Sequence, residues 1–169
     1  GMDAYAQDGV WRNGQVPPLA SARRVTVLGL GELGRTVALE LARLGFDVTG
    51  WSLSGRPVEG IEVLAGPDLP RALQRAEILV CLLPDTAQTR DLLDAETLAL
   101  LPRGAWIVNA GRGTLIDEEA LIPALEDGGR HAVLDVFRHE PLPPGHPFWA
   151  HPRVTVTPHI AADTRPATS

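Results

Sequence analysis

The stretch RVTVLGLGELGRTVALELARL, residues 24–44, decides the fold. Its first five residues form an apolar, β-branched run typical of a buried strand, and residues 33–44 repeat apolar side chains at helical spacing. Between them lies G-x-G-x-x-G, with glycines at Gly29, Gly31 and Gly34. In such a turn the first glycine permits the tight bend, the second admits a pyrophosphate, and the third lets the helix pack against the strand. We therefore predict a dinucleotide-binding turn.

Short apolar runs alternate with helical patterns along the rest of the chain, which indicates βαβ units and a parallel sheet. Asp94 heads a helix expected to end near Pro102, and Asp117 heads another that ends at Gly128, since acidic residues favour helix starts and glycine favours helix ends. We predict an α/β protein with a Rossmann-type, doubly wound parallel sheet of about seven or eight strands in three αβα layers. The expected strands are residues 24–28, 46–51, 61–64, 78–83, 106–109, 132–137 and 154–157.

Two proline-containing segments need separate treatment. Pro123 lies inside the second of these helices, where it removes a backbone donor and is expected to kink the chain. Residues 140–147 contain too many prolines for a helix or a central strand, so we expect an ordered loop there.

Length and charge limit the classes of protein. The 169 residues suit one domain, and the net charge of −6 without a Lys/Arg run argues against nucleic acid or an anionic membrane as a partner. No apolar run approaches the roughly 20 residues that span a bilayer, and no signal peptide is evident, so we expect a cytoplasmic protein. Cys81 is expected to be a buried structural thiol. Gly1 is interpreted as a remnant of tag removal, residues 1–23 as an irregular arm, and residues 24–169 as the domain.

A polar segment follows the second expected strand, about 20 residues after the glycine turn. An NAD-binding domain usually has Asp or Glu at this place to bind the adenosine ribose. Here Ser52, Ser54 and Arg56 stand instead, and hydroxyls with an arginine suit a 2′-phosphate that a carboxylate would repel. We therefore predict a preference for NADP(H). NAD(H) stays open, as does an ordinary polar turn with a solvated arginine.

Three ionisable residues follow three further expected strands: Arg112, Glu140 and His159. Ligands of an open α/β sheet bind outside the carboxyl ends of the strands. Arginine presents a planar fork that matches a carboxylate, histidine can transfer a proton near neutral pH, and a carboxylate beside the histidine would favour its charged form. Each residue alone could be structural, but their joint placement suits reduction of a 2-oxoacid.

Histidines are frequent in the last third of the chain. Their spacings match no zinc pattern and no cysteine pair joins them, so we predict no metal. They are His131, His139, His146, His151 and His159.

The chain resembles the nucleotide-binding domain of the D-isomer-specific 2-hydroxyacid dehydrogenases, and among them the glyoxylate/hydroxypyruvate reductase branch. Six motifs carry the resemblance over nearly the whole chain. They are GLGELG at 29–34, LLPDTAQT at 82–89, NAGRG at 109–113, LDVF at 134–137, EPLP at 140–143 and TPHIAA at 157–162. Leu53 departs from the NADP-preferring reductases, which tend to have a basic residue there.

The resemblance implies a role for each strand-end residue. Arg112 would bind the substrate carboxylate and polarise the keto group, His159 would donate the proton, and Glu140 would orient and charge His159. Reduced NADP would supply hydride to a small 2-oxoacid. The glycine turn, the serine segment and the resemblance together give the expected cofactor-binding residues, which are Gly29, Gly31, Glu32, Leu33, Gly34, Ser52, Ser54, Arg56, Leu83, Pro84, Ala110, Asp135 and Ala161.

Members of the family also have a second lobe that closes the substrate cleft, and the chain offers no stretch for it. We expect either an excised domain or a truncated gene product that binds cofactor but has little activity alone; a homodimer is left open. Two other classes are weighed. A dinucleotide-responsive binding or regulatory protein without turnover would not need Arg112, Glu140 and His159, and neither would a methyltransferase with a similar glycine turn.

Overall fold

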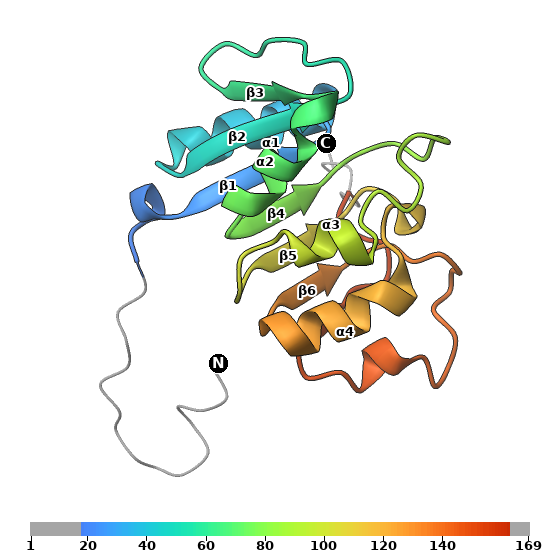
Figure 1. Cartoon of the computed structure of the whole chain (residues 1–169). Coiled ribbons are helices and arrows are strands. Elements are labelled where there is room, and N and C mark those ends of the chain that lie inside the picture. Colours follow the sequence, from blue (N-terminus) through green and yellow to red (C-terminus); the bar gives the residue numbers. More distant parts are fainter. Residues whose placement is uncertain (1–17, 163–169) are drawn as a thin grey trace, which may run out of the picture.

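A seven-stranded parallel sheet forms the centre of the computed structural model, which describes residues 18–162 (Figure 1). The strand order is β3-β2-β1-β4-β5-β6-β7. Because the chain winds outward from β1 to one edge and then from β4 to the other, the sheet is doubly wound, and the predicted Rossmann-type α/β fold is confirmed. The strands are β1 (Arg24–Leu28), β2 (Asp47–Ser52), β3 (Glu62–Ala65), β4 (Ile78–Cys81), β5 (Trp106–Asn109), β6 (His131–Leu134) and β7 (Val154–Val156).

Helices pack on both faces of the sheet. They are α1 (Glu32–Arg43), α2 (Leu69–Arg75), α3 (Ala95–Ala99) and α4 (Glu118–Gly128), with short 3-10 turns at Ala20–Ala22, Gly66–Asp68, Gly113–Leu115 and Pro147–Trp149. Strand alternation separates two cores, since Val25 and Val27 pack with Ala38 of α1. On the opposite face Leu28 packs in the larger core, and the Thr26 hydroxyl donates to the Ala72 carbonyl of α2 at 3.0 Å.

Local chemistry explains where the helices begin and end. Asp94 caps α3 by accepting a hydrogen bond from the Thr97 amide at 2.9 Å, and Asp117 caps α4 through the amides of its first turn. Gly129 ends α4 in the left-handed conformation, with a φ of 60°. Pro123 is accommodated within α4, so the predicted helix is present.

The structure corrects several element boundaries. Strand β4 ends at Cys81 and β6 at Leu134, two and three residues earlier than expected, because the following residues turn into the loops at the carboxyl edge. The helix expected from Asp94 to near Pro102 is only Ala95–Ala99. Helix α2 was not expected at all. It buries only two residues, Ala72 and Leu73, so its sequence shows little helical periodicity.

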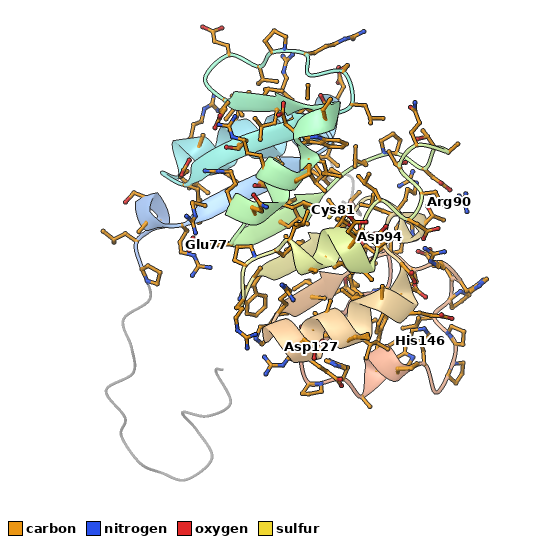
Figure 2. The ribbon with its side chains drawn as sticks, viewed as in Figure 1. Glu77, Cys81, Arg90, Asp94, Asp127 and His146 are labelled. Carbon is orange, nitrogen blue, oxygen red and sulfur yellow. The ribbon has the colours of Figure 1, made fainter. Side chains whose placement is uncertain are left out.

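Cys81, the last residue of β4, is buried in the larger core, as expected (Figure 2). Burial raises the pKa of its thiol to about 12, so the group is neutral at physiological pH. None of the helices described is long and apolar enough to cross a membrane. Most of the expected arm, residues 1–17, and the last seven residues, 163–169, lie outside the described part of the chain.

Candidate functional site

Two of the three glycines in the β1–α1 turn are required by the fold. Gly29 has a φ of +96°, and a Cβ there would lie 2.8 Å from the Leu82 carbonyl carbon. A Cβ on Gly34 would lie 1.8 Å from the Gly29 carbonyl oxygen, so helix α1 can approach the turn this closely only with glycine at that position. These two positions show how β1, the turn and α1 pack together.

Gly31 is different, because nothing in the described part of the chain requires it. Its φ of −66° is open to any residue, and no atom of residues 18–162 lies within 4 Å of the position that a Cβ would occupy. The residue is the N-cap of α1, where backbone amides and the helix dipole attract an anion. A side chain there would project into the space that a bound phosphate needs. The site therefore fits the pyrophosphate of a dinucleotide.

A pocket of about 660 Å³ extends from this turn along the carboxyl edge of the sheet. Most of the expected cofactor-binding residues line it: Gly29, Gly31, Glu32, Leu33, Gly34, Ser52, Ser54, Arg56, Leu83, Pro84 and Ala110. It is also lined by residues that the sequence reasoning did not name as cofactor-binding: Leu30, Leu53, Leu82, Thr86, Gln88, Thr89, Gly111 and Arg112. Thr86, Gln88 and Thr89 lie in the loop that continues from Pro84, and this continuity is the sequence feature that could have identified them. In the structure Thr89 is buried and its hydroxyl donates to the Pro84 carbonyl.

The polar segment after β2 lies at one end of this pocket. The Ser52 hydroxyl accepts a hydrogen bond from the Gly55 amide at 3.1 Å, which leaves its own proton for a ligand. Ser54 and Arg56 line the same pocket. Glu32 is the one carboxylate among the lining residues, and it belongs to the first turn of α1 rather than to the segment after β2.

Arg112 follows β5 on a backbone that its neighbours hold in place. The buried Asn109 side chain donates to the Arg112 carbonyl at 3.0 Å and accepts from the Gly111 amide at 3.1 Å. A Cβ on Gly113 would lie 2.0 Å from the Phe137 carbonyl carbon, so the chain passes tightly against the loop after β6. The guanidinium contacts only its neighbouring Gly111 carbonyl, at 2.7 Å, among the described residues, and is exposed.

His159 and Glu140 form a hydrogen-bonded pair, with 2.7 Å between the histidine Nδ1 and the carboxylate Oε2. The other carboxylate oxygen accepts from the Phe137 amide at 2.9 Å. The hydrogen bond to Glu140 and the negative charge behind it raise the pKa of His159 above its ordinary value. Burial works to raise the pKa of Glu140, but the hydrogen bonds from His159 and Phe137 outweigh it and lower that pKa. The pair is therefore poised to hold a proton on His159.

A second pocket, of about 270 Å³, brings the three strand-end residues together. Arg112, Glu140 and His159 all line it, with Asp85, Gly113, Thr114, Val136, Phe137 and Arg138. Arg112 also lines the larger pocket, so the two pockets adjoin at this residue. A small molecule held at Arg112 would lie beside both His159 and the nearer end of a dinucleotide.

Asp135 and Ala161, two expected cofactor-binding residues, do not line the larger pocket. The buried Asp135 carboxylate instead accepts from the Thr157 hydroxyl at 2.5 Å and from the amides of Ile160 and Ala161 at 3.0 and 2.9 Å. Burial works to raise the pKa of Asp135, and these hydrogen bonds lower it below its ordinary value. The cofactor-binding roles of Asp135 and Ala161 stay predictions. Asp135 shapes the segment that carries His159, which has a φ of +55°.

No cluster of three or more His, Cys, Asp or Glu side chains in the described region is arranged to hold a metal ion.

Comparisons with known proteins give one consistent result. Residues 1–161 match the sequence family described as "D-isomer specific 2-hydroxyacid dehydrogenase, NAD binding domain". Glyoxylate/hydroxypyruvate reductase A of Serratia proteamaculans is 45% identical over 144 residues, which are 84% of this chain and 46% of the relative. The chain thus spans about half the length of the curated relatives that it matches.

Two solved structures have the same fold as this chain. A D-isomer specific 2-hydroxyacid dehydrogenase from Xanthobacter autotrophicus in complex with NADPH and MES has a TM-score of 0.91 and 48% identity, over 98% of this chain and 69% of that one. An NADPH-dependent glyoxylate/hydroxypyruvate reductase from Sinorhizobium meliloti, with NADP and sulfate, has a TM-score of 0.89 and 40% identity, over 96% of this chain and 53% of that one.

Proposed function

Because the chain belongs to the D-isomer specific 2-hydroxyacid dehydrogenase family, as its NAD-binding domain, we propose that it is the dinucleotide-binding part of an NADPH-dependent enzyme. The enzyme would reduce small 2-oxoacids of the glyoxylate and hydroxypyruvate type to D-2-hydroxyacids. One observation carries the proposal. Arg112, Glu140 and His159 line a single pocket that adjoins the dinucleotide pocket at Arg112.

Arg112 supplies recognition of the substrate. Its exposed guanidinium can form two parallel hydrogen bonds to the carboxylate of a 2-oxoacid, and its charge polarises the neighbouring keto group. The buried Asn109 holds the Arg112 backbone from both sides, so the guanidinium starts from a fixed base. Orientation of this kind lowers the barrier by avoiding an entropic cost during the reaction.

His159 supplies the proton. Its Nδ1 faces Glu140, which leaves Nε2 to donate to the oxygen of the reacting carbonyl. Glu140 stabilises the charged imidazolium and fixes its orientation, in the way that a carboxylate beside a catalytic histidine does. The Phe137 amide in turn fixes Glu140. Together these residues hold a proton where the developing alkoxide would need it.

A reduced nicotinamide cofactor would supply the hydride when bound. The α1 N-terminus with Gly31 would hold its pyrophosphate, and Ser52, Ser54 and Arg56 would hold a 2′-phosphate. Two observations support NADP(H) over NAD(H): residues 52–56 include no carboxylate, and the two structural neighbours above contain NADPH or NADP. NAD(H) remains a weaker alternative ligand.

We further propose that residues 24–169 form the cofactor-binding domain and that this domain alone binds cofactor with little turnover. The His159 side chain is 53% exposed and Arg112 is also exposed, so water competes for both. The test follows NADPH absorbance with millimolar glyoxylate or hydroxypyruvate. If the chain turns over as fast as the Serratia relative, the proposal that the domain alone has little turnover is wrong. The cytoplasmic location and the homodimer stay predictions.

A chimera tests the proposed chemistry directly. Residues 24–162 replace the matching segment of the Serratia relative, and the product is assayed with both 2-oxoacids. His159→Ala should lower kcat by about 10²–10⁴-fold, the usual worth of a general acid. Arg112→Ala should mainly impair use of the 2-oxoacid, and both variants should keep their affinity for NADPH. Full turnover by either variant would refute the role given to that residue, and a chimera that binds NADPH without turnover would favour a regulatory protein.

A further inference from the structure

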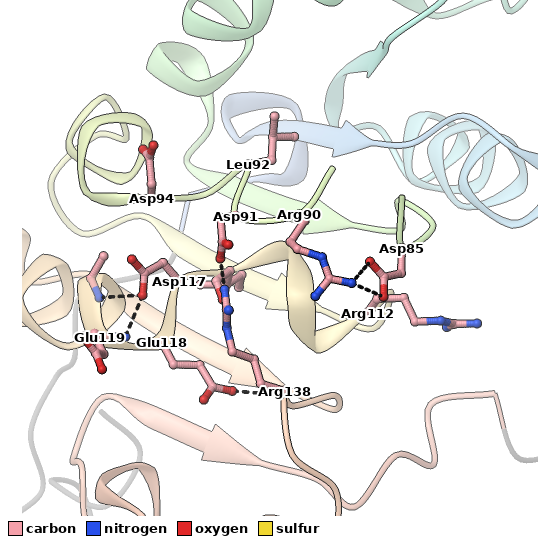
Figure 3. Close-up of polar contacts among 12 residues, drawn as sticks. Asp85, Arg90, Asp91, Leu92, Asp94, Arg112, Asp117, Glu118, Glu119 and Arg138 are labelled. Atoms are coloured by element: carbon pink, nitrogen blue, oxygen red, sulfur yellow. Dashed lines mark hydrogen bonds and ion pairs between the residues drawn. The ribbon is translucent and has the colours of Figure 1, made fainter. Parts of the chain in front are cut away.

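Asp91 has a backbone conformation that residues with side chains rarely adopt. Its φ of 53° lies in the left-handed region, where glycine is at ease and other residues are strained. The Asp91 amide donates to the Thr114 carbonyl at 2.9 Å, and the carboxylate is paired with the Arg138 guanidinium (Figure 3). Strained residues persist where their surroundings hold them, and they gather at functional sites.

Arg138 joins three segments of the chain. Its Nε and Nη2 donate to the Ile116 carbonyl at 3.1 and 2.9 Å, and its backbone amide donates to the Glu118 carboxylate at 3.0 Å (Figure 3). With the ion pair to Asp91, the residue therefore connects the loop before α3, the start of α4 and the loop after β6. Arg138 is itself one of the residues that line the pocket.

The loop after β6 also carries Glu140, two residues beyond Arg138. Residues 137–140 make a tight turn, which is closed by the hydrogen bond from the Phe137 amide to Glu140 Oε1. The same carboxylate reaches His159 through its other oxygen. Where Arg138 is held therefore decides where the turn, and with it the Glu140 carboxylate, can lie.

We propose that Asp91 and Arg138 act as a positioning pair that holds the 137–140 turn, so that Glu140 stays in contact with His159. Arg138 also lines the pocket, but in this scheme the pair acts through Glu140. Its importance for catalysis rests on the proposed function, but the contact itself can be measured without turnover. A second ion pair in the loop before α3 joins Asp85 to Arg90. It makes no hydrogen bond or ion pair to the 137–140 turn among the described residues, so it serves as a matched comparison.

The experiment titrates His159 by NMR in the full chain, with its signal assigned by His159→Gln. Glu140, Asp135 and Arg112 are charged groups that affect the pKa of His159, and Asp85 and Arg138 line the same pocket. Loss of the positive charge of Arg138 would by itself raise that pKa, so a lower pKa reports release of the turn that carries Glu140. Glu140→Gln gives the pKa that His159 has without the carboxylate. Asp91→Gly and Arg138→Met should lower the pKa of His159 toward this value, because the turn is released.

Two further variants make the result specific. Asp91→Asn keeps an acceptor in a residue that tolerates a positive φ, so it should retain most of the wild-type pKa of His159. Arg90→Met, the matched control, should leave the titration unchanged. Asp91→Gly removes the carboxylate and the backbone strain together, so this variant stays folded even if Arg138→Met does not.

The outcomes separate this inference from the proposed function. If Glu140→Gln leaves the titration of His159 unchanged, the Glu140–His159 pair is not formed and both fail. If Glu140→Gln lowers the pKa of His159 but Asp91→Gly does not, the positioning pair is wrong and the proposed function stands. A change in the thermal midpoint without a change in the His159 titration would show a purely structural ion pair and would also overturn the inference.

Discussion

Two glycines of the β1–α1 turn should respond in opposite ways to the same substitution. Gly31→Ala adds a methyl group where no atom of the described residues lies within 4 Å, whereas Gly34→Ala adds one 1.8 Å from the Gly29 carbonyl oxygen. We expect the first to impair binding of NADPH with little effect on stability. The second should destabilise the fold itself, because the backbone of the turn and helix α1 must move apart.

The sizes follow from the two environments. At Gly31 the gain in unfolded-state entropy, about 0.4–1 kcal/mol, is offset by the poorer N-cap, so the net change in stability stays within roughly 1 kcal/mol. A methyl group that displaces a phosphate from one charge-assisted hydrogen bond costs about 1.5–3 kcal/mol, which is roughly 10–150-fold in Kd. Overpacking at Gly34 costs about 1–3 kcal/mol, or roughly 2–12 °C in Tm for a domain of this size.

Calorimetry with NADPH and thermal unfolding of the cofactor-free proteins measure the two effects separately. The reasoning fails if Gly31→Ala binds NADPH as tightly as the wild type, since the space beside Gly31 would then not be the phosphate site. It fails equally if Gly34→Ala unfolds at the same temperature as Gly31→Ala. Cofactor must be absent during unfolding, because a bound ligand raises the apparent stability.

Three further predictions concern cofactor choice, core stability and acid sensitivity. Ser52→Asp should reverse the preference for NADPH over NADH, since a carboxylate repels a 2′-phosphate and accepts from a ribose hydroxyl; calorimetry with both cofactors decides. Arg130→Met should lower the free energy of unfolding by about 1–3 kcal/mol, because the buried guanidinium donates to the carbonyl of Leu101, which follows α3, and to that of Ala124 within α4; urea denaturation measures this. Asp135→Asn should destabilise the chain above the ordinary carboxyl pKa of 3.8, where the ionised wild-type side chain is favoured by its hydrogen bonds, and the difference should shrink as the pH falls below that value; a constant difference from pH 7 to pH 2 would contradict it.

The glycine turn could be predicted from sequence because its requirements are local. A strand, a G-x-G-x-x-G turn and a helix follow one another within residues 24–44, and each position depends on neighbours only a few residues away. The separate roles of the three glycines were also predicted from the motif. The residue that Gly29 packs against could not be predicted, because Leu82 follows β4 and the contact exists only once β1 and β4 are paired.

The parts that sequence reasoning missed depend on side chains far apart in the chain. Nothing near Asp91 marks it as a left-handed residue, because its partner Arg138 lies 47 positions away. The resemblance placed Asp135 at the cofactor, and that role stays a prediction; what the sequence did not reveal is that its carboxylate holds the segment that follows β7. The predicted end of β6 lay too far along the chain, because Phe137 belongs to the turn closed by Glu140 rather than to the strand.

The candidate site falls between these two cases. Parallel strands place their carboxyl ends at one edge, so the order of Arg112, Glu140 and His159 along the chain was enough to predict that they share it. Their contact is a different matter. The 2.7 Å distance between Glu140 and His159 requires the turn closed at Phe137 and a left-handed His159, held beside Asp135 by its hydrogen bonds to the next two residues. Because each of these conditions involves a side chain bonded to a backbone amide, the pairing follows from folded loop geometry and not from strand order alone.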